Sequence, residues 1–263
     1  MSGDGGPVVG RLSVVGVGPA GPEWITPEVA ARLEAATDLV GYGPYLERIA
    51  GPHHRVHASD NREELARAMH ALDMAAEGRD VVVVSGGDPG VFAMAAAIFE
   101  ALEGAQAQRW AGVEVDVTPG VSAMQAAAAR LGAPLGNDFC VISLSDNLKP
   151  WSLIQRRVRL AAEADFAMAF YNPISRARPW QLGEALGIVR EAQGPDTLVM
   201  LATAVGRGER EDVQISTLGE VDPAAANMST LVIVGAASTR VLERPSGRRH
   251  VYTPRYVESA ESR

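Results

Sequence analysis

The segment SGGDP, residues 85–89, has the residue types of a ligand-binding turn and follows four consecutive valines. Adjacent glycines let the backbone approach a ligand closely, and the N–H groups of a strand-to-helix turn attract anionic groups. Asp88 adds a carboxylate that can accept hydrogen bonds from an ammonium group or from hydroxyls. We predict that a helix begins at Asp88, its cap, and carries Phe92, Ala96 and Phe99 on one face. A tight turn that binds no ligand is the alternative for this segment.

A second turn of small residues, TPGVSA at residues 118–123, follows another predicted strand, residues 113–117. In a parallel sheet the carboxyl ends of the strands share one edge, and open α/β sheets usually bind ligands at that edge. The two turns are therefore expected to lie side by side and to outline one pocket.

Gly16, Gly18 and Gly21 match the G-x-G-x-x-G spacing of dinucleotide-binding sites. That fingerprint also needs a helix that opens within the glycine turn and an acidic residue about 20 positions further on. Here prolines interrupt the turn, the first predicted helix begins only at Pro27, and the second predicted strand, residues 38–42, has no acidic residue at its end. A nicotinamide-dependent oxidoreductase is therefore kept only as an alternative.

Three histidines, His53, His54 and His57, fall in one segment, and residues 53 and 57 have the spacing of two metal ligands on one helical turn. A glycine-proline pair precedes them and no carboxylate follows the first histidine, so we predict a surface loop and no metal site. Neither a G-x-S-x-G nucleophile elbow nor a Walker phosphate loop occurs. Cys140 is the single cysteine, lies in an apolar segment, and is predicted to be a buried, inert thiol.

The composition restricts the class of partner. The chain has 263 residues and 47% hydrophobic content, enough for two cores, and no apolar run approaches the roughly 20 residues that a membrane-spanning helix needs. The net charge of −8 argues against broad binding to nucleic acids or membrane surfaces. Arginines such as Arg176 and Arg178 can still hold the carboxylates of a polyanionic small molecule. We therefore expect a cytoplasmic protein that binds a small-molecule substrate, and neither nucleic acid nor membrane.

Strands and helices alternate along the first half of the chain, which predicts a mainly parallel sheet covered by helices on both faces. In the second half, too few residues separate the predicted strands 197–204 and 213–218 for a helical crossover, so these strands are expected to pair antiparallel. The prediction is an α/β fold with a parallel-sheet domain, residues 1–120, and a mixed-sheet domain, residues 121–263. The other predicted strands are residues 11–17, 81–84, 140–144, 166–171 and 230–234, and the predicted helices include residues 27–36, 61–77, 152–164 and 179–192.

Taken together and in order, the motifs resemble the tetrapyrrole methylase family, whose members transfer a methyl group from S-adenosylmethionine to carbons of porphyrin-like macrocycles. The resemblance runs from about residue 10 to residue 257 and is carried by VGVGP, ATDLVGYGPYL, SGGDPGVF, TPGVSA, FYNP and ATAVGRGE. Within the family, SGGDPGVFAMAAAIFEA, ARLGAPLGNDFCVISLSD and FYNPISRARPWQL look like the branch that acts in cobalamin synthesis. That branch methylates carbon 17 of precorrin-3B and contracts the ring to precorrin-4.

The resemblance implies the two-domain fold of class III methyltransferases with the active-site cleft between the domains, a homodimer, and precorrin-3B or a closely related tetrapyrrole as substrate. It implies S-adenosylmethionine as methyl donor, released as S-adenosylhomocysteine. The cofactor-binding residues that it implies are Gly86, Gly87, Asp88, Val91, Ser122, Ala123, Tyr171, Asn172 and Ala204. The substrate side of the site is expected to include Gly16, Gly18, Pro19, Arg176 and Arg178.

A sulfonium methyl group is already electrophilic, so such an enzyme has to orient and shield the reacting carbon and needs neither a nucleophile nor a metal. Ring contraction should benefit from one acid and one base near carbon 20, and Tyr42, Asp60 and Asp146 are the candidates. Relatives that methylate uroporphyrinogen carry an aspartate where this chain has Gly43, so no acid–base role is transferred from that position.

Three alternatives remain at this point. The first is the sibling of the anaerobic route, which acts on cobalt-factor III. The second is a nicotinamide-dependent oxidoreductase built on Gly16 to Gly21. The third is a tetrapyrrole carrier that has no catalytic activity.

Overall fold

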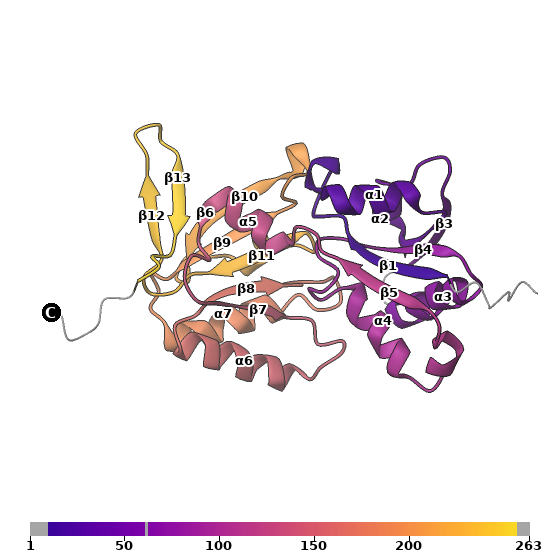
Figure 1. Ribbon diagram of the computed structural model, residues 1–263. Helices are drawn as coiled ribbons and strands as arrows, with labels where there is room; N and C mark the ends of the chain where they lie inside the picture. The colour runs from indigo at the N-terminus through magenta and orange to yellow at the C-terminus, as the bar shows by residue number, and fades with distance from the viewer. Residues whose placement is uncertain (1–9, 61–62, 257–263) are drawn as a thin grey trace, which may run out of the picture. The chain divides into compact units, whose positions relative to one another are not determined.

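The computed structural model describes residues 10–60 and 63–256, and the chain divides into two compact units, Met1–Ala123 and Met124–Arg263. Each unit has its own central sheet, labelled in Figure 1. The first sheet is parallel and the second is mixed. The α/β fold class predicted from the sequence is therefore confirmed.

The N-terminal sheet contains β1 (Arg11–Gly16), β2 (Asp38–Tyr42), β3 (Arg55–Ser59), β4 (Asp80–Ser85) and β5 (Glu114–Thr118). Their order across the sheet is β3-β2-β4-β1-β5, and every neighbouring pair runs parallel. All five carboxyl ends therefore lie along one edge. The surface loop predicted for the three histidines is confirmed for His53 and His54, which precede β3, and was wrong for His57, because residues 55–59 form an edge strand. This strand has one neighbour and is largely exposed, so it shows no apolar pattern.

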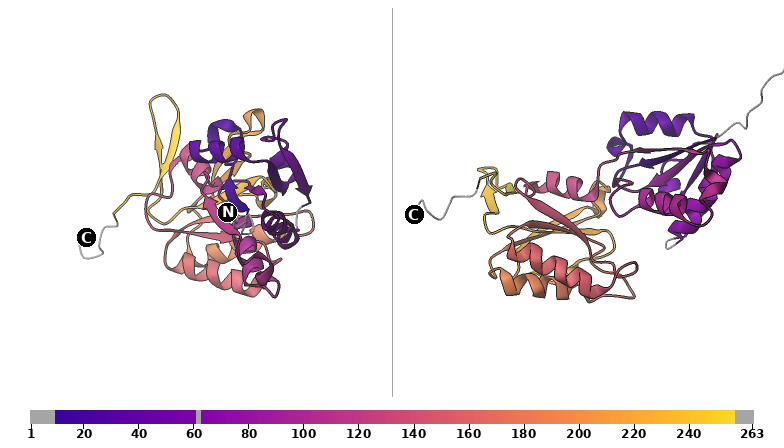
Figure 2. Two further views of the ribbon diagram at one scale, coloured as in Figure 1. Left: turned by 45° about the vertical axis from the view of Figure 1, so that its right-hand side comes forward. Right: turned by 60° about the horizontal axis from the view of Figure 1, so that its bottom comes forward.

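The helical segments of this unit are η1 (Pro22–Trp24), α1 (Pro27–Ala35), α2 (Gly43–Leu46), α3 (Glu64–Ala76), α4 (Met94–Glu103) and η2 (Ala107–Trp110). Helices α1 and α2 cover one face of the sheet, and α3 and α4 cover the other (Figures 1 and 2). On β4, Val82 and Val84 pack with α1 and α2, whereas Val81 and Val83 pack with α3 and α4. The four-valine strand is thus buried on both faces, as predicted.

Two predicted helix starts have different outcomes. Helix α1 begins at Pro27 as predicted, and Thr26 caps it, because the Thr26 hydroxyl accepts a hydrogen bond from the Val29 N–H at 3.3 Å. The helix predicted to begin at Asp88 begins only at Met94, and Phe92 in the preceding turn has a φ of 53°, which no right-handed helix contains. The predicted face is also the exposed one, since Phe92 and Phe99 are each 50% exposed. The side chains that α4 buries are those of Met94, Ala95, Ala97, Ile98 and Ala101.

The C-terminal sheet contains β7 (Phe139–Ser143), β8 (Ala167–Tyr171), β9 (Leu198–Thr203), β10 (Asp212–Thr217) and β11 (Thr230–Val234). The order is β10-β9-β11-β8-β7, with β7 and β8 parallel and the other pairs antiparallel. The predicted antiparallel pairing of the strands at 197–204 and 213–218 is confirmed. Because β8 and β9 are both antiparallel to β11, the carboxyl ends of β7, β8 and β9 lie at one edge.

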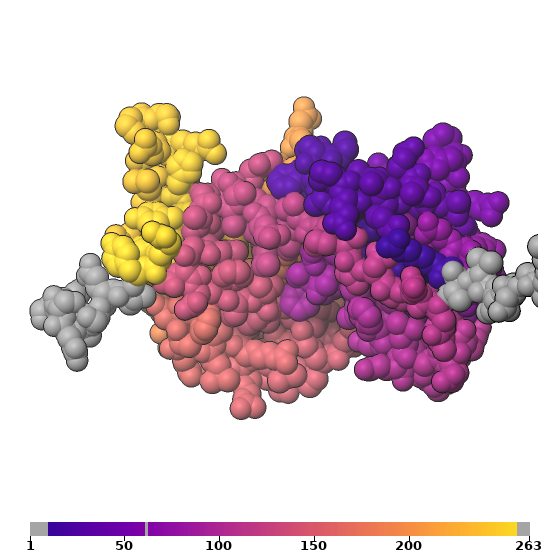
Figure 3. All heavy atoms as spheres, viewed as in Figure 1, coloured from indigo at the N-terminus to yellow at the C-terminus, as the bar shows by residue number. Residues whose placement is uncertain are grey.

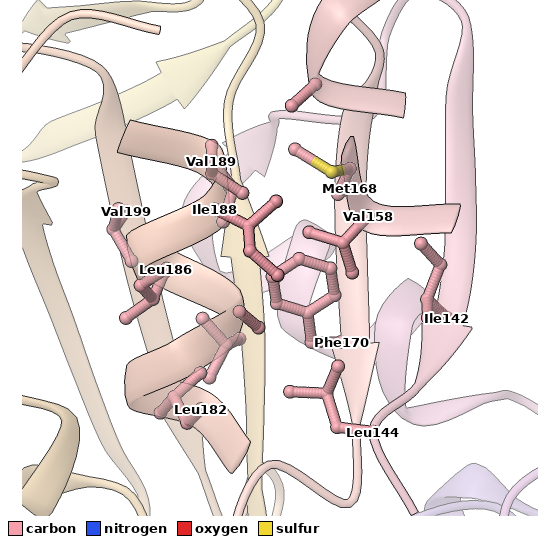
Figure 4. Close-up of a cluster of buried hydrophobic side chains, with 14 of the residues drawn as sticks. Ile142, Leu144, Val158, Met168, Phe170, Leu182, Leu186, Ile188, Val189 and Val199 are labelled. Atoms are coloured by element: carbon pink, nitrogen blue, oxygen red, sulfur yellow. The ribbon is translucent and has the colours of Figure 1, made fainter. Parts of the chain in front are cut away.

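The helical segments of the C-terminal unit are α5 (Ala123–Leu131), α6 (Trp151–Glu163), α7 (Gln181–Ala192), η3 (Gly208–Arg210) and η4 (Pro223–Ala225). Helices α6 and α7 cover one face of the sheet, and α5 lies on the other (Figures 1 and 2). Figure 4 shows the core on the α6/α7 side, where the fully buried Phe170 ring lies among Leu144, Val158 and Ile188.

A small third sheet in the C-terminal unit was not predicted. It consists of β12 (Arg240–Glu243), β13 (Arg249–Tyr252) and β6 (Gly132–Ala133). Figure 3 shows the yellow β12–β13 hairpin standing out from its unit, and every residue of β12 is exposed. An arginine-rich hairpin that buries little has no alternating apolar pattern by which the sequence could indicate it.

Asp38, at the start of β2, is a buried carboxylate with a side chain only 1% exposed. Its Oδ1 bonds His57 Nε2 at 2.9 Å and lies 3.4 Å from an Arg79 Nη1, and its Oδ2 accepts from the Thr37 hydroxyl at 2.9 Å. Burial raises the pKa of Asp38, but the hydrogen bonds from His57 and Thr37 and the charge of Arg79 outweigh it, so the pKa lies below its ordinary value of 3.8.

The lowered pKa of Asp38 predicts acid-sensitive stability. Its ionised form stabilises the fold fully above pH 3.8, and this stabilisation is lost as the pH falls through the lower pKa of the folded state. Asp38→Asn should lower the free energy of unfolding at pH 7 by about 1–3 kcal/mol and flatten its pH dependence at the acidic end. Urea unfolding between pH 7 and pH 3 measures both effects, with the exposed Asp212→Asn as control. If the free energy of unfolding fell by the same amount between pH 7 and pH 3 in the wild type and in Asp38→Asn, the Asp38 carboxylate would not be the source of the acid sensitivity.

Candidate functional site

Strands β1 and β4 are neighbours, yet β1 leads to α1 on one face of the sheet and β4 leads to α4 on the other. Such a switch of direction opens a crevice at the carboxyl ends of the two strands, which is the usual ligand position in open α/β sheets. The turns at this position are those that begin at Gly16 and Ser85. The sheet topology therefore indicates a ligand site at the same turns that the residue types indicate.

Gly16, Gly18, Gly87 and Gly120, from the turns after β1, β4 and β5, pack against each other, and we call them the glycine junction. Gly18 and Gly87 exchange two backbone hydrogen bonds, Gly18 N to Gly87 O at 3.2 Å and Gly87 N to Gly18 O at 2.9 Å. A methyl group on Gly16 would lie 2.5 Å from the Gly87 oxygen, and one on Gly120 would lie 2.5 Å from the Gly16 oxygen. Gly18 and Gly87 also have positive φ angles of 69° and 70°. The prediction that the turns at 85–89 and 118–123 lie side by side is confirmed.

Asp88 joins two of these turns. Its Oδ1 accepts from the Gly90 N–H at 2.8 Å, and its Oδ2 accepts from the Gly120 N–H at 3.1 Å. The prediction that Asp88 caps a helix was therefore wrong, because its oxygens bond a local turn and the neighbouring turn instead. A carboxylate has about four acceptor positions, so Asp88 keeps capacity for a donor from a ligand.

Two residues that the sequence did not single out, Tyr45 and Arg48, pack beside the glycine turns. A methyl group on Gly86 would lie 2.6 Å from the Tyr45 ring carbon Cζ. The Tyr45 ring is perpendicular to that of Tyr42 at 5.3 Å, and Arg48 lies 5.3 Å from the Tyr45 ring centre. Arg48 also donates to the Ala20 carbonyl at 2.8 Å. The candidate acid–base residue Tyr42 is thus linked to the Gly86 turn through Tyr45.

The other predicted residues of the N-terminal unit take different positions. Ser122 is buried and Pro19, Val91 and Ala123 are partly buried, all in or next to the three turns. Asp60 is exposed and follows β3 at the edge of the sheet, where β2 separates β3 from β4. The structure therefore does not bring Asp60 to the glycine junction.

In the C-terminal unit, Tyr171 and Asn172 mark the carboxyl end of β8. The Tyr171 hydroxyl accepts from the Met124 N–H in the first turn of α5 at 3.0 Å, and the Asn172 side chain donates to the Ser143 hydroxyl at 3.0 Å. Asn172 has a φ of 52° and Ala204, after β9, has a φ of 50°. Non-glycine residues with such backbone angles gather at functional sites, so two predicted cofactor residues stand out by conformation as well.

Asp146 and Arg178, predicted respectively for acid–base chemistry and for substrate binding, form an ion pair with each other. Gln181 also donates to the Asp146 carboxylate at 3.4 Å. Arg178 and Ser175 exchange two backbone hydrogen bonds of 3.0 and 3.2 Å, which close a tight loop around the exposed Arg176. The Asp146 carboxylate therefore fixes the loop after β8, and Arg176 is the arginine there that is more open to solvent.

Among residues 10–60 and 63–256, no three His, Cys, Asp or Glu side chains are grouped so that they could hold a metal ion. His57 bonds Asp38, and His54 bonds the Leu33 carbonyl and the Gly51 N–H, each at 2.8 Å. Cys140 is partly rather than fully buried, and burial raises the pKa of its thiol to about 11, so the thiol is protonated at neutral pH. Within the same described ranges, no helix has the length and apolar character that crossing a membrane requires.

The family model of tetrapyrrole (corrin/porphyrin) methylases matches residues 11–222. The chain belongs to this family. The family resemblance predicted from the motifs is therefore confirmed, and with it the prediction of a methyltransferase. A precorrin-3B C(17)-methyltransferase of Sinorhizobium sp is 53% identical over 254 residues, which cover 96% of this chain and 99% of that relative.

Solved structures of the family agree with the fold. The crystal structure of the methyltransferase CobJ has 53% sequence identity and a TM-score of 0.87, and the match covers 93% of this chain and 100% of that one. A uroporphyrin-III C-methyl transferase from Thermus thermophilus, complexed with S-adenyl homocysteine, has 23% identity and a TM-score of 0.63 over 86% of this chain and 97% of its own. The second likeness supports the fold alone.

Proposed function

We propose that this chain is an S-adenosylmethionine-dependent methyltransferase that methylates carbon 17 of precorrin-3B and contracts the macrocycle to precorrin-4. The observation that carries the proposal is the 53% identity, over nearly the full length of both chains, to a relative named for this reaction. The same similarity favours precorrin-3B over the cobalt-containing substrate of the anaerobic route. The glycine junction, with prolines and no α-helix in the turn after β1, argues against a dinucleotide site at Gly16 to Gly21.

The residues of both carboxyl edges fit this cofactor chemically. S-adenosylmethionine supplies an electrophilic methyl group on a sulfonium when it is bound. Gly86, Gly87 and Ala123 present backbone with little side-chain bulk, and Asp88 keeps acceptor capacity for hydroxyl or ammonium groups. We propose as cofactor-binding residues Gly86, Gly87, Asp88, Val91, Ser122, Ala123, Tyr171, Asn172 and Ala204.

On the substrate side, we propose the turn of Gly16, Gly18 and Pro19, in which both glycines are buried and Pro19 is partly buried. Arg176 offers an exposed guanidinium for a carboxylate of the macrocycle. Because Arg178 is paired with Asp146, this pair is better suited to hold the loop of Arg176 than to bind substrate or transfer protons. Among the proposed acid–base residues Tyr42, Asp60 and Asp146, Tyr42 is the one that packs, through Tyr45, beside a proposed cofactor turn.

Calorimetric titrations with S-adenosylhomocysteine and with NADH, run in parallel, test the class of enzyme. We expect S-adenosylhomocysteine to bind and NADH not to bind. Binding of NADH alone would reverse the proposal in favour of an oxidoreductase. Binding of a tetrapyrrole that is indifferent to S-adenosylmethionine would favour a carrier. Parallel assays with metal-free and cobalt-loaded substrate then separate precorrin-3B from cobalt-factor III.

A homodimer located in the cytoplasm completes the proposal, and both parts rest on the family resemblance and composition alone. Light scattering of the purified chain should give twice the mass of one chain. A monomer at micromolar concentration would remove the homodimer from the proposal without affecting the proposed reaction.

A further inference from the structure

The loop after β9, residues 204–208, has an unusual backbone. Ala204, Gly206 and Gly208 have φ angles of 50°, 79° and 61°. Glycine adopts such angles freely, but in alanine the Cβ then crowds the following carbonyl oxygen, so this conformation is strained. Ala204 has no polar side chain that could compensate, and it is buried, at 8% exposure. Its surroundings must therefore hold it in this conformation.

Glu211, which follows this loop, makes two short charge-assisted hydrogen bonds. Its Oε2 accepts from the Gly206 N–H at 2.7 Å, and its Oε1 accepts from Arg130 Nε at 2.6 Å. Arg130 lies in the last turn of α5, so the pair ties the loop to a helix that is distant in the sequence. Burial raises the pKa of Glu211, but the bonds from Arg130 and Gly206 outweigh it and hold the pKa below its ordinary value. The carboxylate is thus ionised at neutral pH.

The loop closes on itself between the strained residue and this carboxylate. The Arg207 N–H donates to the Ala204 carbonyl and the Glu211 N–H donates to the Gly208 carbonyl, each at 2.9 Å. Ala204 is also bound to the segment just before β11, because its N–H donates to the Ser229 carbonyl at 3.0 Å. Ala204 and Gly206 lie in the same hydrogen-bonded turn. A movement of Gly206 would therefore also move the Ala204 carbonyl group.

We infer that the Arg130–Glu211 pair positions the cofactor-binding loop: it holds residues 204–208 in the strained conformation in which the Ala204 backbone meets S-adenosylmethionine. The inference rests on the proposed function, because Ala204 is a cofactor residue only there. Arg130 and Glu211 are positioning residues, which act through the loop. The pair lowers the free energy needed to organise the loop when the cofactor binds, so its removal should weaken cofactor affinity more than turnover.

Glu211→Gln tests this inference, because it keeps the shape of the side chain and removes its charge. We expect the Kd for S-adenosylhomocysteine to rise about tenfold, since the substitution weakens two hydrogen bonds to a charged group. The KM for S-adenosylmethionine should rise similarly, with kcat at saturation changed less than about twofold. Glu191→Gln is the matched control, since it breaks the exposed Arg159–Glu191 pair of 2.5 Å in the same unit and should leave both constants unchanged.

Ala204→Gly provides the second variant, because glycine takes a positive φ without strain. If the pair acts by holding Ala204, the loss of affinity caused by Glu211→Gln should be smaller in the Ala204→Gly background. If Glu211→Gln lost as much affinity in the Ala204→Gly background as in the wild type, the inference would be overturned. Unchanged cofactor affinity in Glu211→Gln would also overturn it. So would a Glu211→Gln variant with a lower thermal midpoint and a lower kcat but an unchanged KM. Failure of the wild-type protein to bind S-adenosylhomocysteine would instead overturn the proposed function itself.

Discussion

Replacing Gly120 by alanine is expected to abolish detectable binding of S-adenosylhomocysteine. The added methyl group would lie 2.5 Å from the Gly16 carbonyl oxygen and closer still to that of Gly87. Both obstacles are backbone atoms of the glycine junction, so the turns after β1 and β4 would have to move apart. The shift would also pull the Gly120 N–H away from Asp88. Overpacking of this kind costs about 1–3 kcal/mol, so the sheets should remain folded while the site is lost.

Calorimetry with S-adenosylhomocysteine and thermal unfolding together measure this effect. Gly187→Ala in α7 is the matched control, because nothing lies within 4 Å of the added methyl group there. It should leave binding unchanged and stabilise the helix by up to about 1 kcal/mol. Normal affinity in Gly120→Ala would mean that the junction adapts to a methyl group and that its geometry does not set the cofactor site.

Asp88→Ala is expected to weaken S-adenosylhomocysteine binding at least about tenfold in a protein that remains folded. The substitution leaves the Gly90 and Gly120 N–H groups without their acceptor and removes the carboxylate proposed to meet the ligand. Each lost hydrogen bond to a charged group is worth about 1.5–3 kcal/mol, part of which will appear as reduced stability. Titration calorimetry and denaturant unfolding separate the two contributions.

Asp222→Ala is the control for Asp88, because Asp222 also accepts a backbone hydrogen bond, from the Ala224 N–H at 2.9 Å, at an exposed 3-10 helix. It should cost some stability and no affinity. If Asp88→Ala likewise lost only stability, Asp88 would only hold the two turns together and would not bind the cofactor.

Much of the fold could be predicted because the deciding signals are local. The valines of β4, buried on both faces, and the Thr26 cap are visible in the sequence itself. The strand at residues 55–59 was missed because an exposed edge strand needs no apolar pattern. The start of α4 was misplaced because Asp88 and Pro89 look like a cap and a first helical residue, while tertiary contacts direct Asp88 to Gly120.

The candidate site was predictable only in part. The glycine turns and the resemblance to the family follow from residue types in order. However, Gly16 and Gly120 must be glycines because each contacts the backbone of the other. No local sequence pattern reveals this contact. The Asp146–Arg178 and Arg130–Glu211 pairs join residues 32 and 81 positions apart, so both require the folded chain. Sequence reasoning therefore identified the residues proposed to meet a ligand more readily than the residues proposed to position them.

Incubation of the protein with precorrin-3B and S-adenosylmethionine that carries a labelled methyl group, followed by mass spectrometry and NMR of the pigment, tests the proposed reaction. We expect a product heavier by one labelled methyl group, attached at carbon 17, in a contracted ring from which carbon 20 has been extruded. Precorrin-3B recovered unchanged, from a preparation that binds S-adenosylhomocysteine, would contradict the proposed reaction.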